Sequence, residues 1–164
     1  MIDVHGAMQC QCANVRVQRK KFRWELGMAT KEEIAAFLQT SFPQSKLTIE
    51  AVGNRGSTVT LAVSEDDLRP GGTVSGPTLM SVADAALYVA VLGEIGIVPL
   101  AVTSSLTINF LRKPRAGRHI TGVCTLLKVG RHLAVGEVAL FSAGNEEPVA
   151  HVVGTYSIPA NAPE

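Results

Sequence analysis

A strongly apolar segment over residues 78–92 constrains the fold more than any other feature of the sequence. It presents no polar face at helical spacing, and a helix that is apolar all round lies inside a protein. Pro77 suits the first position of a helix, Gly76 is the expected cap, and Gly93 ends the apolar run. Fifteen helical residues extend about 22 Å, too short for a bilayer and suited to the centre of a domain. The segment therefore predicts one buried central helix.

The remaining segments predict one further helix and several strands. Residues 30–42 repeat apolar positions at helical spacing, with Thr30 as N-cap and Glu33 completing a capping box. A hairpin is expected from residues 47–52 and 57–63, joined by a turn at 53–56. Later segments rich in Val, Thr and Ile predict four strands, at 101–111, 119–129, 133–142 and 149–158.

The order of these segments predicts the fold class. The connections between the last four strands are short enough for antiparallel neighbours, which predicts a four-strand meander. Strands and helices do not alternate, which excludes a doubly wound nucleotide-binding fold. We therefore expect an α+β domain in which a curved antiparallel sheet wraps around one long central helix.

Composition and charge exclude several classes of protein. The chain has 164 residues, 46% of them hydrophobic, which is too apolar for a disordered chain. Its formal charge of +1 excludes a nucleic-acid binder that acts through a strong overall field. No stretch reaches 18 consecutive apolar residues, so no membrane span is expected. The chain has three cysteines, Cys10, Cys12 and Cys124. Their odd number and their spacing do not fit a disulfide framework, which favours a reducing compartment and hence the cytoplasm.

Residues 1–27 differ from the rest of the chain. They carry five basic and two acidic side chains, and their apolar residues repeat at neither strand nor helix spacing. We interpret them as a disordered or artefactual basic arm, with Met28 as an alternative start, and residues 28–164 as a single domain. An arm that binds nucleic acid or a membrane is the less favoured alternative. A metal site formed by Cys10, Cys12 and His5 is also disfavoured.

Asp84 is the one charged residue within the apolar segment. A carboxylate there must be paired, be neutralised, or open onto a cavity. The neighbours on its helix face include Ser81 and Tyr88 but no cation, so no local salt bridge explains it. It is either a structural residue that these hydroxyls satisfy or a catalytic carboxylate, and we favour the catalytic interpretation.

The glycine-rich residues 71–76 precede the helix. Glycine lets the backbone approach a ligand closely, and a helix start offers free N–H groups and partial positive charge. This combination suits the oxyanion that develops when a carbonyl is attacked. Pro77 lacks an N–H group, so the available donors are the amides of Gly76, Thr78 and Leu79. A plain turn and cap is the alternative, and the absence of Lys excludes a phosphate-binding loop.

Several motifs follow one another in a specific order along residues 47–158. They are Gly72-Thr73-Val74-Ser75-Gly76-Pro77, Asp84 nine positions after Ser75, the strand from Thr103 through Leu111, Arg112-Lys113-Pro114, a Gly-Arg turn, and a last strand with Gly-Thr-Tyr. In this order and spacing the chain resembles the hotdog-fold acyl-CoA thioesterases of the phenylacetate-degradation (PaaI-like) family. The basic turn after the strand is the least specific of these features.

The resemblance implies a hydrolase that converts an acyl- or aryl-CoA thioester to free acid and CoA, without a metal or other cofactor. It implies a hotdog homodimer, often paired into a homotetramer, with active sites between subunits. Asp84 would be the general base or nucleophile, the Gly76 amide would polarise the thioester carbonyl, and Thr103 would help to place water. Because the Asp and the glycine come from opposite subunits in the family, a monomer should be inactive.

The resemblance also implies residues that bind the substrate and its CoA group. They are Ser75, Arg69, Ser105, Arg112, Lys113, Gly130, Arg131 and His132. A basic cluster at strand ends contains most of the charged ones: Arg112, Lys113, Arg115 and Arg118, with Arg131 and His132 one hairpin over. The resemblance implies that the CoA phosphates bind there, where the planar guanidinium of arginine suits phosphate. A solvated turn is the alternative.

The sequence departs from the family motif at two places. Ser75-Gly76-Pro77 replaces His-Gly-Gly, and Arg69 replaces an upstream Asn. These changes leave open a protein of the same fold that binds acyl-CoA without hydrolysing it. A hotdog hydratase or dehydratase ranks last, because no histidine is expected near the helix.

Two further expectations concern apolar side chains. Met80, Leu87, Tyr88 and Val91 are expected to line an acyl pocket, although the same residues could equally form the core face of the helix. We interpret Cys124 as a buried small hydrophobe rather than a nucleophile, because it lies in the middle of a strand without an adjacent base.

Overall fold

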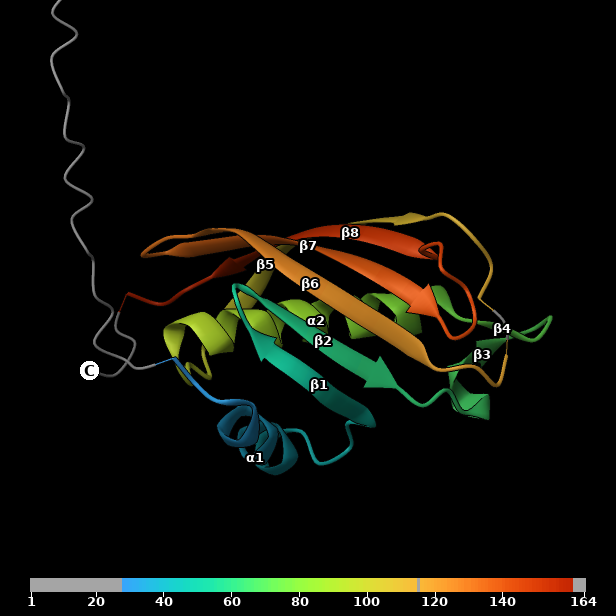
Figure 1. Ribbon diagram of the computed structural model, residues 1–164, viewed down its shortest axis with the longest axis horizontal. Coiled ribbons are helices and arrows are strands. Elements are labelled where there is room, and N and C mark those ends of the chain that lie inside the picture. The colour runs from blue at the N-terminus through green and yellow to red at the C-terminus, as the bar shows by residue number, and fades with distance from the viewer. Residues whose placement is uncertain (1–27, 115, 161–164) are drawn as a thin grey trace, which may run out of the picture.

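A six-stranded antiparallel sheet curves around one long helix, and a second helix lies outside the sheet edge (Figure 1). The computed structural model describes residues 28–114 and 116–160. The expected basic arm, with Cys10, Cys12 and His5, lies outside the described residues. The elements are α1 (Lys31–Ser41), β1 (Leu47–Gly53), β2 (Gly56–Leu61), the 3-10 turn η1 (Glu65–Asp67), β3 (Leu68–Arg69), β4 (Thr73–Val74), α2 (Gly76–Ile95), β5 (Val102–Phe110), β6 (Ile120–Val129), β7 (Leu133–Ser142) and β8 (Ala150–Ser157).

The helix α2 is the predicted central helix, and it contacts all six strands of the large sheet. Among the described residues, α2 alone has the length and apolar composition of a membrane span, and 67% of that window is buried inside the protein. Leu87 is fully buried and rests on Gly136 and Gly154, which are register partners on β7 and β8. A Cβ at either glycine would come within 2.6 Å of a Leu87 methyl group. Two bare glycines therefore let the helix lie directly on the sheet.

The central helix begins earlier and ends later than the sequence predicts. The N-cap is Ser75 rather than Gly76, because its Oγ accepts the Thr78 amide at 3.3 Å and glycine has no such acceptor. The helix continues through Gly93 to Ile95 and is capped by Gly96, whose φ is 84°. Gly93 serves packing instead, since a Cβ there would lie 2.5 Å from a Val52 methyl group of β1.

The predicted first helix and hairpin are confirmed. Thr30 and Glu33 form the expected capping box, with the Thr30 Oγ1 accepting the Glu33 amide at 3.2 Å. The strands β1 and β2 pair around Asn54 and Arg55, both of which have positive φ, as a tight hairpin turn requires.

The predicted four-strand meander is wrong for its first strand. The strand order is β1-β2-β6-β7-β8-β5, so β6, β7 and β8 form a meander while β5 lies at the far edge against β8. The β1–β2 hairpin pairs with β6 through β2 and so occupies the place beside β6 that β5 was expected to take. A short connection therefore does not by itself make two strands neighbours.

A bulge in β5 determines which side chains face the helix. Thr103 is opposite Tyr156 and Ser105 is opposite Thr155, so Ser104 is an extra residue between them. Tyr156 belongs to the buried, helix-facing set of β8, whereas Thr155 belongs to the opposite set. The bulge consequently directs Thr103 toward α2 and Ser105 to the outer face of the sheet.

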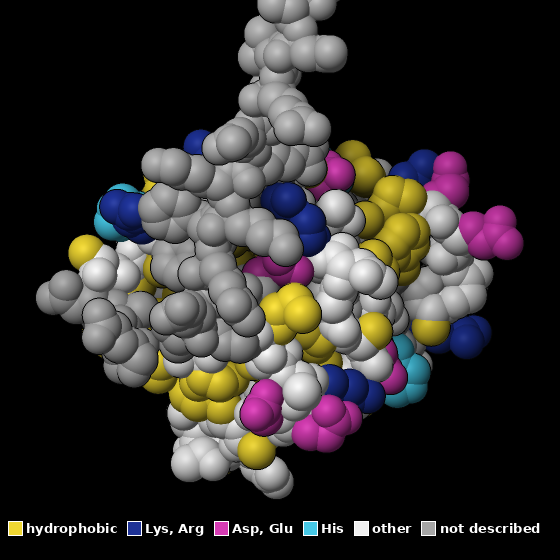
Figure 2. All heavy atoms as spheres, turned by 60° about the vertical axis from the view of Figure 1, so that its left-hand side comes forward, with side chains coloured by type: hydrophobic (Ala, Val, Ile, Leu, Met, Phe, Trp, Pro, Cys, Tyr) yellow, Lys and Arg dark blue, Asp and Glu magenta, His cyan; other side chains and the backbone are white. Residues whose placement is uncertain are grey.

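The described surface carries charges of both signs. On the face drawn in Figure 2, outside the grey residues, Lys and Arg side chains are interspersed with Asp and Glu. This distribution agrees with the formal charge of +1 and gives no field of one sign on that face.

Candidate functional site

The Asp84 carboxylate is half-buried and held by hydroxyls from two strands. Thr103 Oγ1 of β5 donates to Asp84 Oδ1 at 2.6 Å, and the Tyr156 hydroxyl of β8 donates to the same oxygen at 2.9 Å. In the structural alternative, hydroxyls such as those of Ser81 or Tyr88 satisfy the carboxylate; the hydroxyls that do so come instead from neighbouring strands. The Tyr88 hydroxyl donates instead to the Pro99 carbonyl at 3.5 Å. Side chains on facing strands approach Asp84 directly, whereas those on its own helix point along the same face.

The other carboxylate oxygen is open. Within residues 28–114 and 116–160, Asp84 Oδ2 accepts no hydrogen bond. The side chain lines a cavity of about 730 Å³, and Thr103 and Tyr156 line it too. The carboxylate thus stands at the wall of a hollow, with one oxygen bound to the protein and the other accepting no hydrogen bond from the described residues.

The cavity lining is mainly apolar. Leu38 and Phe42 contribute from α1 and its cap, Leu47 and Leu61 from β1 and β2, and Val82 from α2. Such a surface can accept a hydrocarbon or aromatic group next to a reactive carboxylate.

Only one of the four predicted lining residues lines this cavity. It is Tyr88. Leu87 and Val91 are fully buried in the core, and Met80 is 40% exposed elsewhere on α2. The face of α2 that carries Asp84 therefore differs from the face that carries most of the large apolar side chains.

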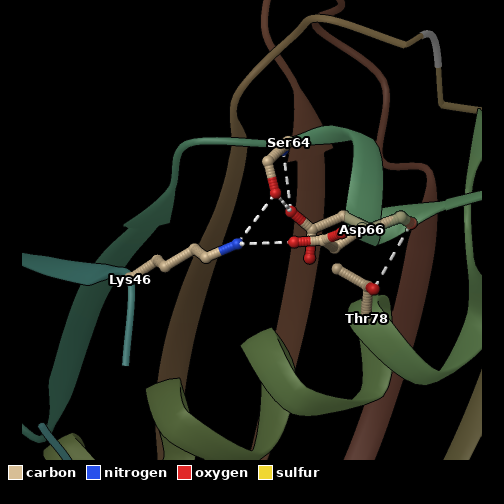
Figure 3. A network of polar contacts seen from close by, with 5 residues as sticks. Lys46, Ser64, Asp66 and Thr78 are labelled. Carbon is tan, nitrogen blue, oxygen red and sulfur yellow. Dashed lines mark hydrogen bonds and ion pairs between the residues drawn. The ribbon is translucent and has the colours of Figure 1, made fainter. Parts of the chain in front are cut away.

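A polar network forms the rim of the cavity near the start of α2 (Figure 3). The Lys46 ammonium donates to Ser64 Oγ at 2.9 Å and lies 3.7 Å from Asp66 Oδ2. The Ser64 amide and hydroxyl both donate to the Asp67 carboxylate at 2.8 Å, and the Thr78 hydroxyl donates to the Asp67 carbonyl at 3.4 Å. Burial alone would raise the pKa of Asp67, but the Ser64 hydrogen bonds outweigh it and the net pKa is lowered. These contacts fix the loop before α2 to the helix.

Gly76 lies at the N-terminal end of α2, outside the residues that line the cavity. Of the three predicted amide donors, Thr78 donates to Ser75 Oγ and Leu79 to the Ser75 carbonyl. In the described part of the chain, only the Gly76 amide of these three donates no hydrogen bond. The Phe110 ring covers this glycine, since a Cβ there would lie 3.2 Å from Phe110 Cζ. Gly76 precedes Asp84 by eight residues, which is about 12 Å along a helix axis.

The predicted CoA-binding residues divide into separate groups. Ser75, Arg69, Arg112 and Lys113 lie toward the start of α2, where Thr73 also donates to the Pro114 carbonyl at 2.8 Å. The Ser75 hydroxyl is committed to the helix cap. Arg112 donates to the Pro148 carbonyl at 2.9 Å and pairs with Glu147 at 2.8 Å.

The remaining predicted residues lie elsewhere. The turn Gly130-Arg131-His132 adjoins Leu133, which pairs with Ser157, whereas Phe110 pairs with Ala150 at the other end of β8. These ends are about 23 Å apart along the strand. The prediction of a single basic cluster is therefore wrong within one chain, because the turn with Arg112 and the turn with Arg131 lie at opposite ends of the sheet. Ser105 faces away from Asp84, and Arg115 lies outside the described residues.

Cys124 and the histidines take no part in this site. Cys124 is buried, and desolvation followed by the nearby charge of Glu137 raises the pKa of its thiol to about 12. It is the predicted structural cysteine. Over residues 28–114 and 116–160, no histidine lines the cavity, and no group of three or more His, Cys, Asp and Glu side chains could hold a metal ion.

Comparisons with known proteins agree with this geometry. Residues 71–149 match a family described as the thioesterase superfamily. A solved structure of a putative thioesterase from Silicibacter sp. TM1040 is 44% identical, covers 82% of this chain and 95% of its own, and has a TM-score of 0.75. No curated protein matches the chain.

Two more distant structures are similar in fold. The E. coli PaaI protein from the phenylacetic acid degradation operon is 22% identical, with 79% of this chain and 91% of its own covered and a TM-score of 0.69. A hypothetical thioesterase with coenzyme A from Streptococcus pneumoniae TIGR4 is 21% identical, with 69% and 85% covered and a TM-score of 0.61. These likenesses confirm the hotdog fold that the sequence predicts.

Proposed function

The chain belongs to the thioesterase superfamily, and from this premise we propose that it is an acyl-CoA thioesterase that converts an acyl- or aryl-CoA to free acid and CoA. The observation that carries this proposal is the Asp84 carboxylate at the cavity wall, with Oδ1 held by two hydroxyls and Oδ2 open. A similar fold holds coenzyme A in the S. pneumoniae protein, which supports CoA as the thiol.

The chemistry of a thioester suits this arrangement. Asp84 Oδ2 takes a proton from water while the water oxygen bonds to the carbonyl carbon, and the carbon–sulfur bond then breaks to release the CoA thiolate. The thiolate leaves without strong acid assistance, so one carboxylate suffices. Alternatively, Oδ2 attacks the carbonyl carbon itself and the carbon–sulfur bond breaks to expel the CoA thiolate. Water then hydrolyses the resulting anhydride to the free acid and the restored Asp84 carboxylate. Thr103 holds Asp84 and stands at the cavity, where it can also help to place the water.

The carbonyl oxygen also needs a donor, and the Gly76 amide of the same chain is too remote. A carbonyl group that touches both a carboxylate and an amide spans only about 6 Å, whereas Gly76 and Asp84 are about 12 Å apart along α2. We therefore assign the donor to Gly76 of the partner subunit. The site is then complete only in a dimer.

The free edge of β5 supplies the geometry for such a dimer. Val102 and Phe110, near its two ends, are 56% and 55% exposed although apolar. Antiparallel pairing of two β5 strands about a two-fold axis sets the Thr103 end of one beside the Phe110 end of the other. Asp84 of one subunit then faces the helix start that carries Gly76 of its partner.

The same pairing would reunite the separated basic residues. Arg131 and His132 lie near the Thr103 end of their own sheet, and Arg112 and Lys113 lie just beyond the Phe110 end. In the dimer the first pair from one subunit and the second pair from its partner occupy the same end. We propose that the phosphates of CoA bind there, with Arg69 nearby.

We further place the enzyme in the cytoplasm as a homodimer or homotetramer. The chain has three cysteines, an odd number without the regular spacing of a disulfide framework, which suits a reducing compartment. The likeness in fold to the E. coli PaaI protein suggests aryl-CoA thioesters, as in phenylacetic acid degradation, as the first substrates to test.

Release of CoA from short, medium, long and aromatic acyl-CoAs by the wild type and Asp84→Ala tests the proposal. We expect wild-type turnover and a loss of roughly 10²- to 10⁴-fold in Asp84→Ala, with circular dichroism unchanged, because the variant lacks the base. Equal hydrolysis by both proteins would reject Asp84 as the catalytic residue.

A non-catalytic acyl-CoA-binding protein is the second candidate. It is favoured by Ser75, whose hydroxyl is committed to the helix cap and carries no charge, and by Arg69 in place of an Asn. Thermal stabilisation by acyl-CoA without thiol release, at every acyl length, would support this candidate over the enzyme.

A further inference from the structure

Tyr156 contacts the Asp84 carboxylate but has no role in the account above. It lies on β8, 3% exposed, directly opposite Thr103 of β5. Its hydroxyl donates to Asp84 Oδ1 at 2.9 Å and lies 3.4 Å from the Asp84 carbonyl oxygen. The side chain therefore ties the middle of α2 to the sheet beside the reactive carboxylate.

The position of Tyr156 is more strongly fixed than that of Thr103. Its ring stacks on Tyr88 with a centroid distance of 5.6 Å and an interplanar angle of 17°, and β8 lies between β7 and β5 in the sheet. Thr103 is exposed on the edge strand β5, next to a bulge. A donor held by burial and stacking restricts the carboxylate better than a short side chain on an edge strand.

Both hydroxyls converge on the same oxygen. An oxygen that accepts two hydrogen bonds is a poor proton acceptor and a poor nucleophile, because its lone pairs are engaged. Oδ2 keeps its lone pairs, and rotation of the carboxylate would break both bonds to Oδ1. The two donors thus fix the direction in which Oδ2 points.

Resting on the proposed thioesterase function, we propose that Tyr156 is a positioning residue that commits Asp84 Oδ1 to the protein and makes Oδ2 the reacting oxygen. Burial raises the pKa of Tyr156, so its hydroxyl stays protonated and remains a donor throughout the neutral range. Tyr156 acts through Asp84, because its hydroxyl donates to the carboxylate.

This role predicts a specific kinetic signature for Tyr156→Phe. The phenylalanine ring keeps the stacking on Tyr88 and the burial, and only the hydroxyl is lost. We expect kcat to fall about 10- to 100-fold with KM within about twofold of the wild type, because orientation of the base is lost and binding is not. A structural role alone would lower the unfolding temperature without this split.

Two comparisons make the test specific. Thr60→Val is the matched control, since it removes a part-buried hydroxyl on the outer face of the sheet. Among the described residues, that hydroxyl forms a hydrogen bond only with Thr121, across β2 and β6. The Thr60→Val variant should keep wild-type kcat. The effects of Tyr156→Phe and Thr103→Val on kcat should not be independent, because both donors act on one oxygen. The fall in kcat of the double variant should therefore differ from the product of the two single falls.

The outcomes separate this inference from the proposed function. If Asp84→Asn is inactive while Tyr156→Phe keeps a kcat within twofold of the wild type, the positioning role is rejected and the thioesterase assignment stands. If Asp84→Asn is fully active, Asp84 is not the catalytic residue and the positioning role is overturned with it. The thioesterase function itself fails only if the wild type releases no CoA from any acyl-CoA. A kcat loss in Tyr156→Phe that is matched by Thr60→Val would also overturn the positioning role.

Discussion

Gly76 is assigned a role in which only its backbone matters. Among the first amides of α2, those of Thr78 and Leu79 are bonded to Ser75, and Pro77 has no amide hydrogen. A carbonyl at this helix start would therefore meet one free donor. Phe110 lies over the same glycine, which brings a side chain of β5 to the place where the partner is expected.

A pair of substitutions at Gly76 isolates that donor. Gly76→Pro removes the N–H group, and Ser75, with φ −72° and ψ 152°, already has the conformation that a residue before proline requires. Gly76→Ala keeps the N–H group and meets the same Phe110 contact, so it is the matched control. We expect kcat of the proline variant to be about 10²-fold below that of the alanine variant. Steady-state kinetics check this, and equal kcat values would remove Gly76 from the mechanism.

The sequence singles out Asp84 because a lone carboxylate in an apolar helix needs an explanation. It cannot identify Tyr156 as the partner, although Gly-Thr-Tyr in the last strand was part of the recognised pattern. Alternation along that strand can place Tyr156 on the inner face. Which helix residue it meets depends on how α2 packs against β8. The approach of Thr103 to the same carboxylate depends on the β5–β8 register and on the bulge at Ser104, and none of these leaves a local signal.

At the scale of elements, α2 is predicted well and its ends less well. The apolar pattern identifies the buried helix, but the helix continues through Gly93, where the absence of a side chain permits contact with Val52 and does not terminate the helix. The position of β5 also escapes prediction, because strand neighbours depend on where α2 delivers the chain. The separation of Arg112 from Arg131 follows from the same topology.

The contact between α2 and the sheet predicts a graded effect on stability. Gly154→Ala places a methyl group 2.5 Å from Leu87 Cδ2, which the fully buried leucine cannot avoid without moving the helix. We expect a loss of about 1–3 kcal/mol in the free energy of unfolding, measured by urea denaturation. Gly122→Ala is the control, because its new methyl would lie no closer than 3.2 Å to any side chain, and it should cost less. The reverse order would contradict this account of how helix and sheet pack.

At the scale of the whole molecule, the proposed mechanism requires each chain to supply two half-sites. Its cavity carries Asp84 with Thr103 and Tyr156, and its helix start carries Gly76 with the basic residues Arg69, Arg112 and Lys113 nearby. Within one chain, Gly76 and Asp84 are about 12 Å apart along α2. A two-fold axis at the β5 edge would bring the first assembly of each subunit to the second assembly of the other.

Restoration of activity between two inactive subunits tests this account most directly. Asp84→Ala and Gly76→Pro chains with different affinity tags are co-expressed, and the heterodimer is purified on both tags. One of its two sites then combines an intact Asp84 with an intact Gly76, so we expect about half of the wild-type kcat per dimer while each parent dimer stays inactive. A heterodimer as inactive as its parents would show that each site is built within a single chain.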